Sequence, residues 1–278
     1  MATPDPRAPQ ARPVANGDGW RVSEVTCTLG PRDRSFEERH SSVGIAAVIA
    51  GTFQYRSPAG RALLYPGAFM LGNAGACFEC GHEHAPGDVC LAFQFAPEYF
   101  DEIAAGVTGA GGFRFKGGML PALRAMNAPL AAAQARAESG DALAAEESAV
   151  ALAEAVVRNA SGEAAADPRP SARDQRRLSA VVRYIEERTR EALNLDRLAA
   201  VACMSKYHFL RVFRRSLGVT PHQFLLERRL ARAARALRKG GAPVSVVAVE
   251  EGFGDLSTFN AQFRRAFGAN PREFRRSR

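Results

Sequence analysis

The chain has 278 residues, of which 37 are Lys or Arg and 29 are Asp or Glu, and its formal net charge is +8. This length allows two domains of ordinary size, each with its own hydrophobic core. No apolar run approaches the ~18–20 residues that a membrane-spanning helix needs, which argues against a membrane protein and favours a soluble cytoplasmic one.

The charges are unevenly distributed along the chain. Residues 170–278 contain 23 Lys or Arg and 10 Asp or Glu, whereas residues 1–169 contain 14 and 19. A GC-rich genome would explain why 34 of the basic residues are Arg, but not why they gather in one half. A basic C-terminal part joined to a mildly acidic N-terminal part indicates a nucleic-acid-binding domain attached to a domain with another task.

The N-terminal half begins with residues 1–19, which are rich in Pro, Ala, Asp and Arg and lack the apolar run of a signal peptide. They predict a disordered tail. From 20 to about 100, short apolar runs at 44–53, 61–64, 69–71 and 89–95 are broken by Gly, Pro, Asn and Asp. This spacing predicts a β-barrel or β-sandwich.

A cluster of cysteines and histidines lies within this β-rich region. Five cysteines, an odd number without a secretion signal, favour reduced thiols or a metal site over structural disulfides. The cluster comprises Cys77, Cys80, His82, His84 and Cys90. Alternate residues of a strand point the same way, so Cys80, His82 and His84 could share one face, with Asp88, Cys90 or His40 as a further ligand.

Three interpretations of this cluster remain open. Sulfur and nitrogen donors this close in sequence suit Zn²⁺ or another divalent metal. Alternatively, Cys77 and Cys80 form a reversible disulfide that responds to redox conditions. In the third interpretation the cysteines are small buried side chains without a ligand.

Residues 121–159 are rich in Ala, Leu, Glu and Gln and predict helices over about 120–160. These helices would pack on the β-rich region and on a second copy of the chain, or form an intramolecular hairpin. Residues 20–160 are therefore expected to be one domain. Residues 161–172, with their Gly and Pro, predict an interdomain linker.

Residues 173–278 predict helices only. An amphipathic helix spans about 173–190, and Asn194 caps the next one. Cys203 lies in a turn, and Ser205 caps a helix that runs to about 217 with Phe209 and Phe213 on its buried side. Two short helices joined by a tight turn predict a helix-turn-helix unit.

A longer helix follows and leads to a second unit. The capping box Thr220–Gln223 begins it, and about 27 Å later it ends near Lys239. Arg228, Arg232 and Arg235 are expected on its outward side. Its length suits two recognition helices about one DNA turn apart, roughly 34 Å. Residues 244–249 have β-prone valines but keep helical spacing, so they predict a helix.

The second unit contains the strongest motif. Gly252 suits a left-handed turn, and Asp255 suits an N-cap. Phe259, Phe263 and Phe267 recur every four residues and form one apolar side. Gly268 then ends the helix, and Pro271 begins a last one.

The pattern Gly-Phe-x-Asp-x-Ser-x-Phe-x-x-x-Phe-Arg at 252–264, followed by Gly-x-x-Pro-x-x-Phe-Arg at 268–275, resembles the C-terminal signature of the AraC/XylS family of bacterial transcription regulators. The resemblance covers about residues 173–276. It implies a sequence-specific regulator that places two recognition helices in successive major grooves of double-stranded operator DNA. A homodimer is expected, with RNA polymerase as a further partner.

The resemblance also implies which residues contact DNA. The base-reading residues would be Tyr207, Leu210 and Arg211 in the first unit and Leu256, Ser257, Asn260 and Ala261 in the second. The cations near phosphate would be Arg214, Arg215, Arg264 and Arg265, and Lys206 is a further DNA-contacting residue. Family members often have Arg in place of Ala261 and a polar residue in place of Leu256, so we expect Arg211 to determine most of the specificity.

The β-rich half resembles the cupin barrel that precedes this domain in many AraC-type regulators, with His40 and His82-x-His84 near cupin motif positions. Cupins usually bind metal through two His, a Glu and a later His. Here Asp88 would have to replace the Glu, and Asn73 stands near the position of the last His, so the set is incomplete.

The expected fold class is therefore α+β multidomain, a cupin-like barrel with helices followed by an all-α domain at 173–278. We expect a non-enzymatic regulator that senses a small molecule, a metal or a redox signal. A metal-dependent cupin enzyme tethered to DNA is one alternative. The other is a constitutive DNA-binding protein whose N-terminal half only dimerises.

Overall fold

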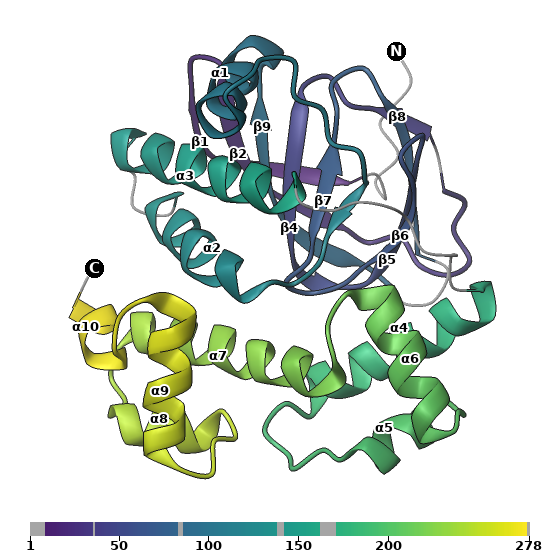
Figure 1. Cartoon of the computed structure of the whole chain (residues 1–278), viewed down its shortest axis with the longest axis vertical. Coiled ribbons are helices and arrows are strands. Elements are labelled where there is room, and N and C mark those ends of the chain that lie inside the picture. The colour runs from purple at the N-terminus through teal and green to yellow at the C-terminus, as the bar shows by residue number, and fades with distance from the viewer. Residues whose placement is uncertain (1–8, 36, 83–85, 138–141, 162–170, 277–278) are drawn as a thin grey trace.

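The computed structural model describes residues 9–35, 37–82, 86–137, 142–161 and 171–276. Its N-terminal half is built on β-strands with helices along one side, and its C-terminal half is helical (Figure 1). The chain is therefore a mixture of a β-rich part and an all-α part, as the sequence predicts. Within the described residues, no helix is both long and apolar enough to cross a membrane.

The described strands form two antiparallel sheets. The larger sheet has the order β1-β2-β9-β4-β7-β10 and the smaller one β3-β8-β5-β6. The strands are β1 (Gln10–Gly17), β2 (Trp20–Cys27), β3 (Glu37–Arg39), β4 (Val43–Gly51), β5 (Phe53–Ser57), β6 (Gly60–Leu64), β7 (Phe69–Gly72), β8 (Cys77–Gly81), β9 (Asp88–Phe95) and β10 (Met119–Leu120). Residues of both sheets, such as Val48 and Tyr55, share one buried core. The β-rich architecture is confirmed, whereas the two sheets do not form one closed barrel among the described residues.

The prediction of a disordered tail at 1–19 is wrong for the part of it that the structure describes. Gln10–Gly17 form β1, which pairs with β2 in an antiparallel hairpin that ends at Gly17 and Trp20. Gly19 has a φ of 78°, which the turn between the strands requires. Val14 and Ala15 are half-buried against the large core, so apolar contact holds the strand in place despite its polar composition. Residues 1–8 lie outside the described part of the chain.

Three helices cover the outer face of the large sheet: α1 (Pro97–Thr108), α2 (Arg124–Ala137) and α3 (Ala142–Ala160) (Figure 1). Leu152 and Val156 of α3 are buried in the same core as Phe93 and Ile45 of the sheet. Helices α2 and α3 pack on each other, so the structure has the intramolecular hairpin that the sequence left open. Helix α1 was not expected, and it begins at Pro97, where proline favours the first helical turn.

The helical half contains α4 (Ala172–Glu187), α5 (Leu195–Val201), α6 (Lys206–Leu217), α7 (Pro221–Lys239), α8 (Val244–Glu250), α9 (Leu256–Phe267) and α10 (Pro271–Arg276). The valine-rich segment is a helix, as its spacing predicts, because Val247 and Ala248 are buried on one side of it. Helix α7 crosses the molecule, with α4–α6 at one end and α8–α10 at the other (Figure 1).

The two halves are in direct contact. The Tyr65 hydroxyl donates to the backbone carbonyl of Leu217 at the end of α6, and the Tyr65 ring meets that of Phe224 edge to face at 5.5 Å. At another point, Arg124 Nε lies 2.9 Å from Oε1 of buried Glu227 on α7. The expected linker at 161–172 lies mostly outside the described residues, and Ser171 caps α4.

Candidate functional site

The two recognition helices begin at side-chain caps. Ser205 Oγ accepts the backbone amide of His208 at 3.4 Å and so begins α6. At the start of α9, the Asp255 carboxylate accepts the amides of Ser257 at 2.9 Å and Thr258 at 2.8 Å. These hydrogen bonds, first of all those with Thr258, lower the pKa of Asp255. The caps act within three residues of sequence, so the sequence predicts them well.

The turns of the two units use the same backbone conformation. In the first, the Cys203 amide donates to Ala200 O and Met204 to Ala199 O. In the second, Gly252 donates to Val249 O and Phe253 to Ala248 O, the same pattern at equivalent positions. Cys203 has a φ of 50° and Gly252 a φ of 85°. Cys203 therefore occupies a position that favours glycine, which agrees with its expected role as a small turn residue.

Each recognition helix has one buried aromatic side. In α6 it is formed by Phe209, Phe213 and Leu217, and in α9 by Phe259, Phe263 and Phe267. Phe263 also contacts Phe274 of α10 edge to face at 5.2 Å. These contacts fix the rotation of each helix about its axis, so the opposite sides are turned away from the core.

The structure places most of the predicted DNA-contacting residues on those outward sides. The exposed residues among them are Arg211, Arg214, Arg215, Leu256, Ser257, Ala261, Arg264 and Arg265. Leu210 and Asn260 are half-buried at the edges. Lys206 and Tyr207 belong to the first turn of α6, but their side chains lie outside the described part of the structure. Leu256 is 43% exposed, unusual for a leucine at the start of a helix.

Helix α7 holds the two units through ion pairs. Arg228 Nε lies 2.5 Å from Glu186 of α4, and Arg232 Nε lies 2.7 Å from Glu251, which follows α8. Arg229 donates to the carbonyls of Thr189 and Glu191. The expectation that Arg228 points outward is wrong, because it is only 5% exposed and paired with Glu186. These arginines fix the geometry between the two units.

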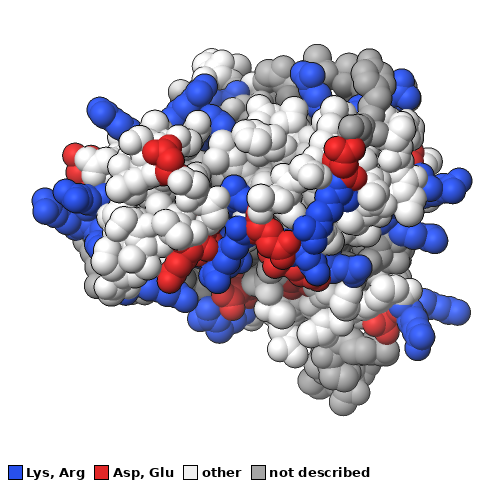
Figure 2. Space-filling view, turned by 90° about the horizontal axis from the view of Figure 1, so that it is seen from below, with Lys and Arg blue, Asp and Glu red and all other residues white. Residues whose placement is uncertain are grey.

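Figure 2 shows the face formed by the helical half. Lys and Arg side chains project around its margins, and Asp and Glu lie among them near the middle.

A second group of candidate residues is buried between the two sheets. His82 Nε2 lies 2.6 Å from Asp88 Oδ1, and Cys27 Sγ lies 4.0 Å from His82 Nδ1. The Cys90 thiol donates to Asp88 Oδ2 at 3.2 Å. All four residues are less than 9% exposed. Sulfur, nitrogen and oxygen donors thus meet in one dry region.

Burial and hydrogen bonds act in opposite directions on the pKa of His82 in this cluster. Burial disfavours the charged imidazole, but hydrogen bonds with Asp88 and Cys27 outweigh it and raise the pKa of His82 to about 9. Burial, and then the charge of Asp88, raise the pKa of the Cys80 and Cys90 thiols well above the usual range. Such thiols are poor nucleophiles.

The sequence identified part of this cluster. Cys80 and His82 lie on the inward side of β8 and its extension, whereas Cys77, an odd number of residues away, points to the other side. Three strand steps separate the two Cα atoms by about 10 Å, beyond the reach of a disulfide, so the Cys77–Cys80 pairing does not fit this strand. His84 lies outside the described residues. Cys27 was missed, because only the pairing of β2 with β9 brings it to Asp88.

The cupin-type ligand set is not assembled among the described residues. His40 Nε2 lies 3.0 Å from the Tyr55 hydroxyl, and its ring stacks on Phe78 at 4.1 Å, so its neighbours are aromatic. Burial lowers the pKa of His40 to about 4. The Asn73 amide donates to the Phe115 carbonyl and accepts from the Phe115 backbone N–H, each at 2.9 Å. Both residues have structural roles.

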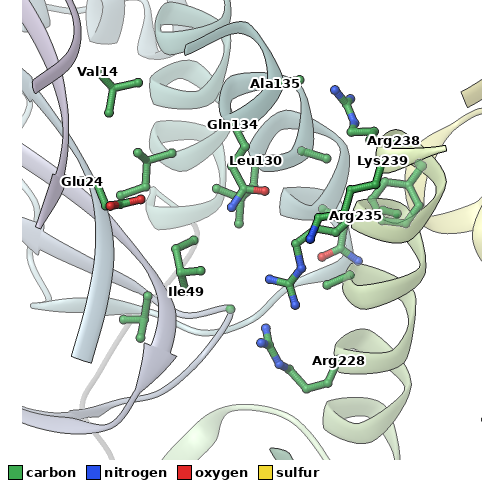
Figure 3. A pocket seen from close by; sticks show the side chains of 18 of the residues that line it. Val14, Glu24, Ile49, Leu130, Gln134, Ala135, Arg228, Arg235, Arg238 and Lys239 are labelled. Carbon is green, nitrogen blue, oxygen red and sulfur yellow. The ribbon is translucent and has the colours of Figure 1, made fainter. Parts of the chain in front are cut away.

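A cavity of about 530 Å³ lies between the large sheet, α2 and α7. Figure 3 shows Val14, Glu24 and Ile49 on the side of the sheet, Leu130 on α2, and Arg235 and Lys239 extending from α7. Burial, and next the charge of Arg228, lower the pKa of Arg235. Glu24 on the sheet side is paired with Arg12 at 3.3 Å, so the cationic side of the cavity lies opposite apolar groups and one neutralised carboxylate.

The comparisons with known proteins match a helix-turn-helix family and transcriptional regulators. Residues 198–277 match the helix-turn-helix domain family. The probable transcriptional regulator LumQ of Photobacterium leiognathi is 33% identical over 91 residues, which are 33% of this chain and 37% of LumQ. The RCS-specific HTH-type transcriptional activator RclR of Escherichia coli K12 is 36% identical over 99 residues, which are 36% of this chain and 35% of RclR.

Solved structures also match over this segment. The DNA-binding domain of AdpA, a global transcriptional factor, in complex with a target DNA is 34% identical, with a TM-score of 0.35 over 36% of this chain and 90% of that chain. A transcriptional regulator with an AraC-type DNA-binding domain from Chromobacterium violaceum is 29% identical, with a TM-score of 0.36 over 38% of this chain and 96% of that chain.

The C-terminal third of the chain is thus a helix-turn-helix domain. The curated proteins that match about a third of this chain are transcriptional regulators. The match spans only about a third of the length of those relatives.

Proposed function

We propose that this chain is a sequence-specific DNA-binding transcription regulator of the AraC/XylS type. The observation behind the proposal is a pair of helix-turn-helix units within residues 198–277, which match the helix-turn-helix family. In each unit the second helix turns a side with arginines to solvent. Double-stranded DNA is the proposed partner, and RNA polymerase is a further one.

The exposed sides of α6 and α9 are proposed to differ in their tasks. Of the residues proposed to read bases, only Arg211 can form a bidentate contact with guanine. Leu256 and Ala261 of α9 offer apolar contact with a thymine methyl, which discriminates less. Tyr207, Leu210, Ser257 and Asn260 complete the proposed base-reading set. Arg214, Arg215, Arg264 and Arg265 are proposed to contact phosphate, and Lys206 is proposed as a further DNA-contacting residue.

Single substitutions test this division of tasks. Arg211→Ala should cost about 1–3 kcal/mol on the preferred site and relax its sequence preference, whereas Arg265→Ala should weaken binding to all sequences and reduce the salt slope by about one. Arg61→Ala, an exposed arginine of β6 in the N-terminal half, is the charge-matched control. DNA selected from a random pool supplies the preferred site. Equal losses on selected and random DNA for both variants would contradict the assignment.

The N-terminal half is proposed to be a cupin-like sensor domain. Its contacts with α6 and α7 offer a route by which a bound signal would alter the DNA-binding domain. The cavity beside α7 suits a small organic anion with an apolar body, because Arg235 faces Ile49 and Leu130 across it. A thermal-shift screen of carboxylic acids tests this, and any stabilisation should be lost in Arg235→Gln. Stabilisation that persists in this variant would place the ligand elsewhere.

Homodimerisation through the helices of the N-terminal half stays a prediction. The exposed stripe of α3 contains Glu147, Ala151 and Arg158, with Leu143, 68% exposed, as its large apolar side chain. Sedimentation velocity of the full chain and of Leu143→Glu tests the prediction. A monomer at micromolar concentration in both proteins would refute it.

A further inference from the structure

The buried cluster between the sheets is assembled from elements far apart in sequence. Cys27 is paired directly opposite Asp88 in the antiparallel ladder of β2 and β9, and Cys90 lies two residues further along β9. These three side chains therefore project from one face of the large sheet. His82 follows β8 of the small sheet and approaches from the opposite side.

The donor atoms are close enough to share one ion. In a tetrahedral site with metal–sulfur bonds of about 2.3 Å and metal–nitrogen or metal–oxygen bonds of about 2.0–2.1 Å, neighbouring donors are roughly 3.3–3.8 Å apart. The separations of 2.6 Å between His82 Nε2 and Asp88 Oδ1 and of 3.2 Å between Cys90 Sγ and Asp88 Oδ2 are shorter than that range. The separation of 4.0 Å between Cys27 Sγ and His82 Nδ1 is longer. One ion takes a single nitrogen of His82, and one ligand atom from each of Cys27, His82 and Asp88 already lies within 4.8 Å of the others. Movements of about 1 Å, with a turn of the imidazole, would bring these donors to coordination distance.

The donor types select the class of ion. A thiolate and an imidazole favour Zn²⁺ and similar borderline ions, whereas Mg²⁺ and Ca²⁺ prefer sites made of oxygen. The Asp88 carboxylate is compatible with zinc, and the Cys90 thiol, already 3.2 Å from Asp88 Oδ2, offers a further sulfur. Two cysteines, one histidine and one aspartate would complete four-coordination.

We propose that Cys27, His82, Asp88 and Cys90 bind one divalent cation of the zinc class between the two sheets of the N-terminal half. The ion replaces the proton between His82 and Asp88 and the protons of the two thiols, which leave to solvent as it binds. The bound ion links β2 and β9 of the large sheet to the end of β8 in the small one. The site is independent of DNA binding, and it replaces the set Cys77, Cys80, His82, His84 and Cys90 that the sequence suggested.

Metal analysis of the full chain tests the proposal. Protein purified without chelators, incubated with zinc chloride and desalted, should retain about one zinc per chain. Cys27→Ser and Cys90→Ser should each lose most of it. Cys203→Ser, in an exposed turn, and Cys77→Ser, on the outward side of β8, are matched thiol controls that should retain it.

A measurement on the unchanged protein covers the case in which the buried variants fail to fold. Substitution of Co²⁺ should produce intense thiolate-to-cobalt absorption in the near ultraviolet together with visible bands of a tetrahedral ion. Three results would each overturn the proposal: no retained metal, retention by Cys27→Ser equal to that of the unchanged chain, or loss of metal in Cys77→Ser. A Cys27–Cys90 disulfide in the purified protein, found by mass spectrometry, would also overturn it. DNA binding measured in the same samples keeps this outcome separate from that of the proposed function.

Discussion

Cys203 offers a direct test of the backbone conformation in the first turn. It is the only non-glycine residue with positive φ among the described residues, and its φ of 50° lies in the left-handed region. Its equivalent in the second unit is Gly252, with the same hydrogen bonds. We therefore predict that Cys203→Gly stabilises the protein, although glycine is usually unfavourable.

The size of the effect follows from two opposing contributions. A side chain in the left-handed conformation costs about 1–2 kcal/mol, which glycine relieves. Glycine also adds freedom to the unfolded chain, which costs about 0.4–1 kcal/mol. The net gain in the free energy of unfolding is therefore between about 0 and 1.6 kcal/mol, with a middle value of roughly 0.8 kcal/mol. Gly252→Ala should act in reverse and more strongly, because its new Cβ would lie 3.1 Å from the Arg190 carbonyl oxygen.

Urea unfolding followed by circular dichroism measures both changes. Cys203→Ala is the control, since it removes the thiol but keeps a Cβ in the same strained conformation. The free energy of unfolding should rise for Cys203→Gly. For Cys203→Ala it should stay within about 0.5 kcal/mol of that of the original protein. If the glycine variant is no more stable than the alanine variant, then the strain assigned to this turn does not exist.

Two further predictions concern buried ionisable groups. Glu227→Ala removes the acceptor of Arg124 and Asn127 at the contact between the halves. It should lower the free energy of unfolding in urea by about 1–3 kcal/mol. The control Glu154→Ala breaks an exposed ion pair on α3 and should lower it by less than about 0.5 kcal/mol. For His40, the folded pKa of about 4 lies below the unfolded value of 6.5, so the unfolded chain takes up the proton first as pH falls. Stability should therefore decrease from pH 6.5 to pH 4, and His40→Phe should reduce that slope; an unchanged slope would contradict the buried neutral state.

Local signals predicted the helical half well. The caps at Asn194, Ser205, Thr220 and Asp255 act within three residues, so composition and spacing are enough to place them. The β1 strand was missed because its composition is polar, although Asn16-Gly17-Asp18-Gly19 is a turn sequence typical of a hairpin. Helix periodicity assigned Arg228 to the outward side of α7, but its partner Glu186 comes from another helix and could not be inferred from spacing.

The buried cluster between the sheets is a second case in which local spacing could not predict a contact between distant residues. His82, Asp88 and Cys90 are close in sequence and could be suspected from it, whereas Cys27 is 55 residues from His82. Its place depends on the register of β2 against β9, where a shift by one residue would turn Cys27 to the opposite face. No local pattern fixes that register, so the decisive ligand appears only in the folded chain.

The contacts between the halves bear on how a signal would reach DNA. Helix α6 is held at its C-terminal end by Tyr65, at the end of β6, while α9 packs in the same core as Ala131 of α2. The two recognition helices are thus anchored to different elements of the N-terminal half, and the cavity is bounded by one of these elements, α2, and by the large sheet. The ion pairs of α7 resist independent movement of the two units. We infer that a ligand which changes the distance between α2 and the sheet would shift α7 and both units together, altering their fit to successive grooves.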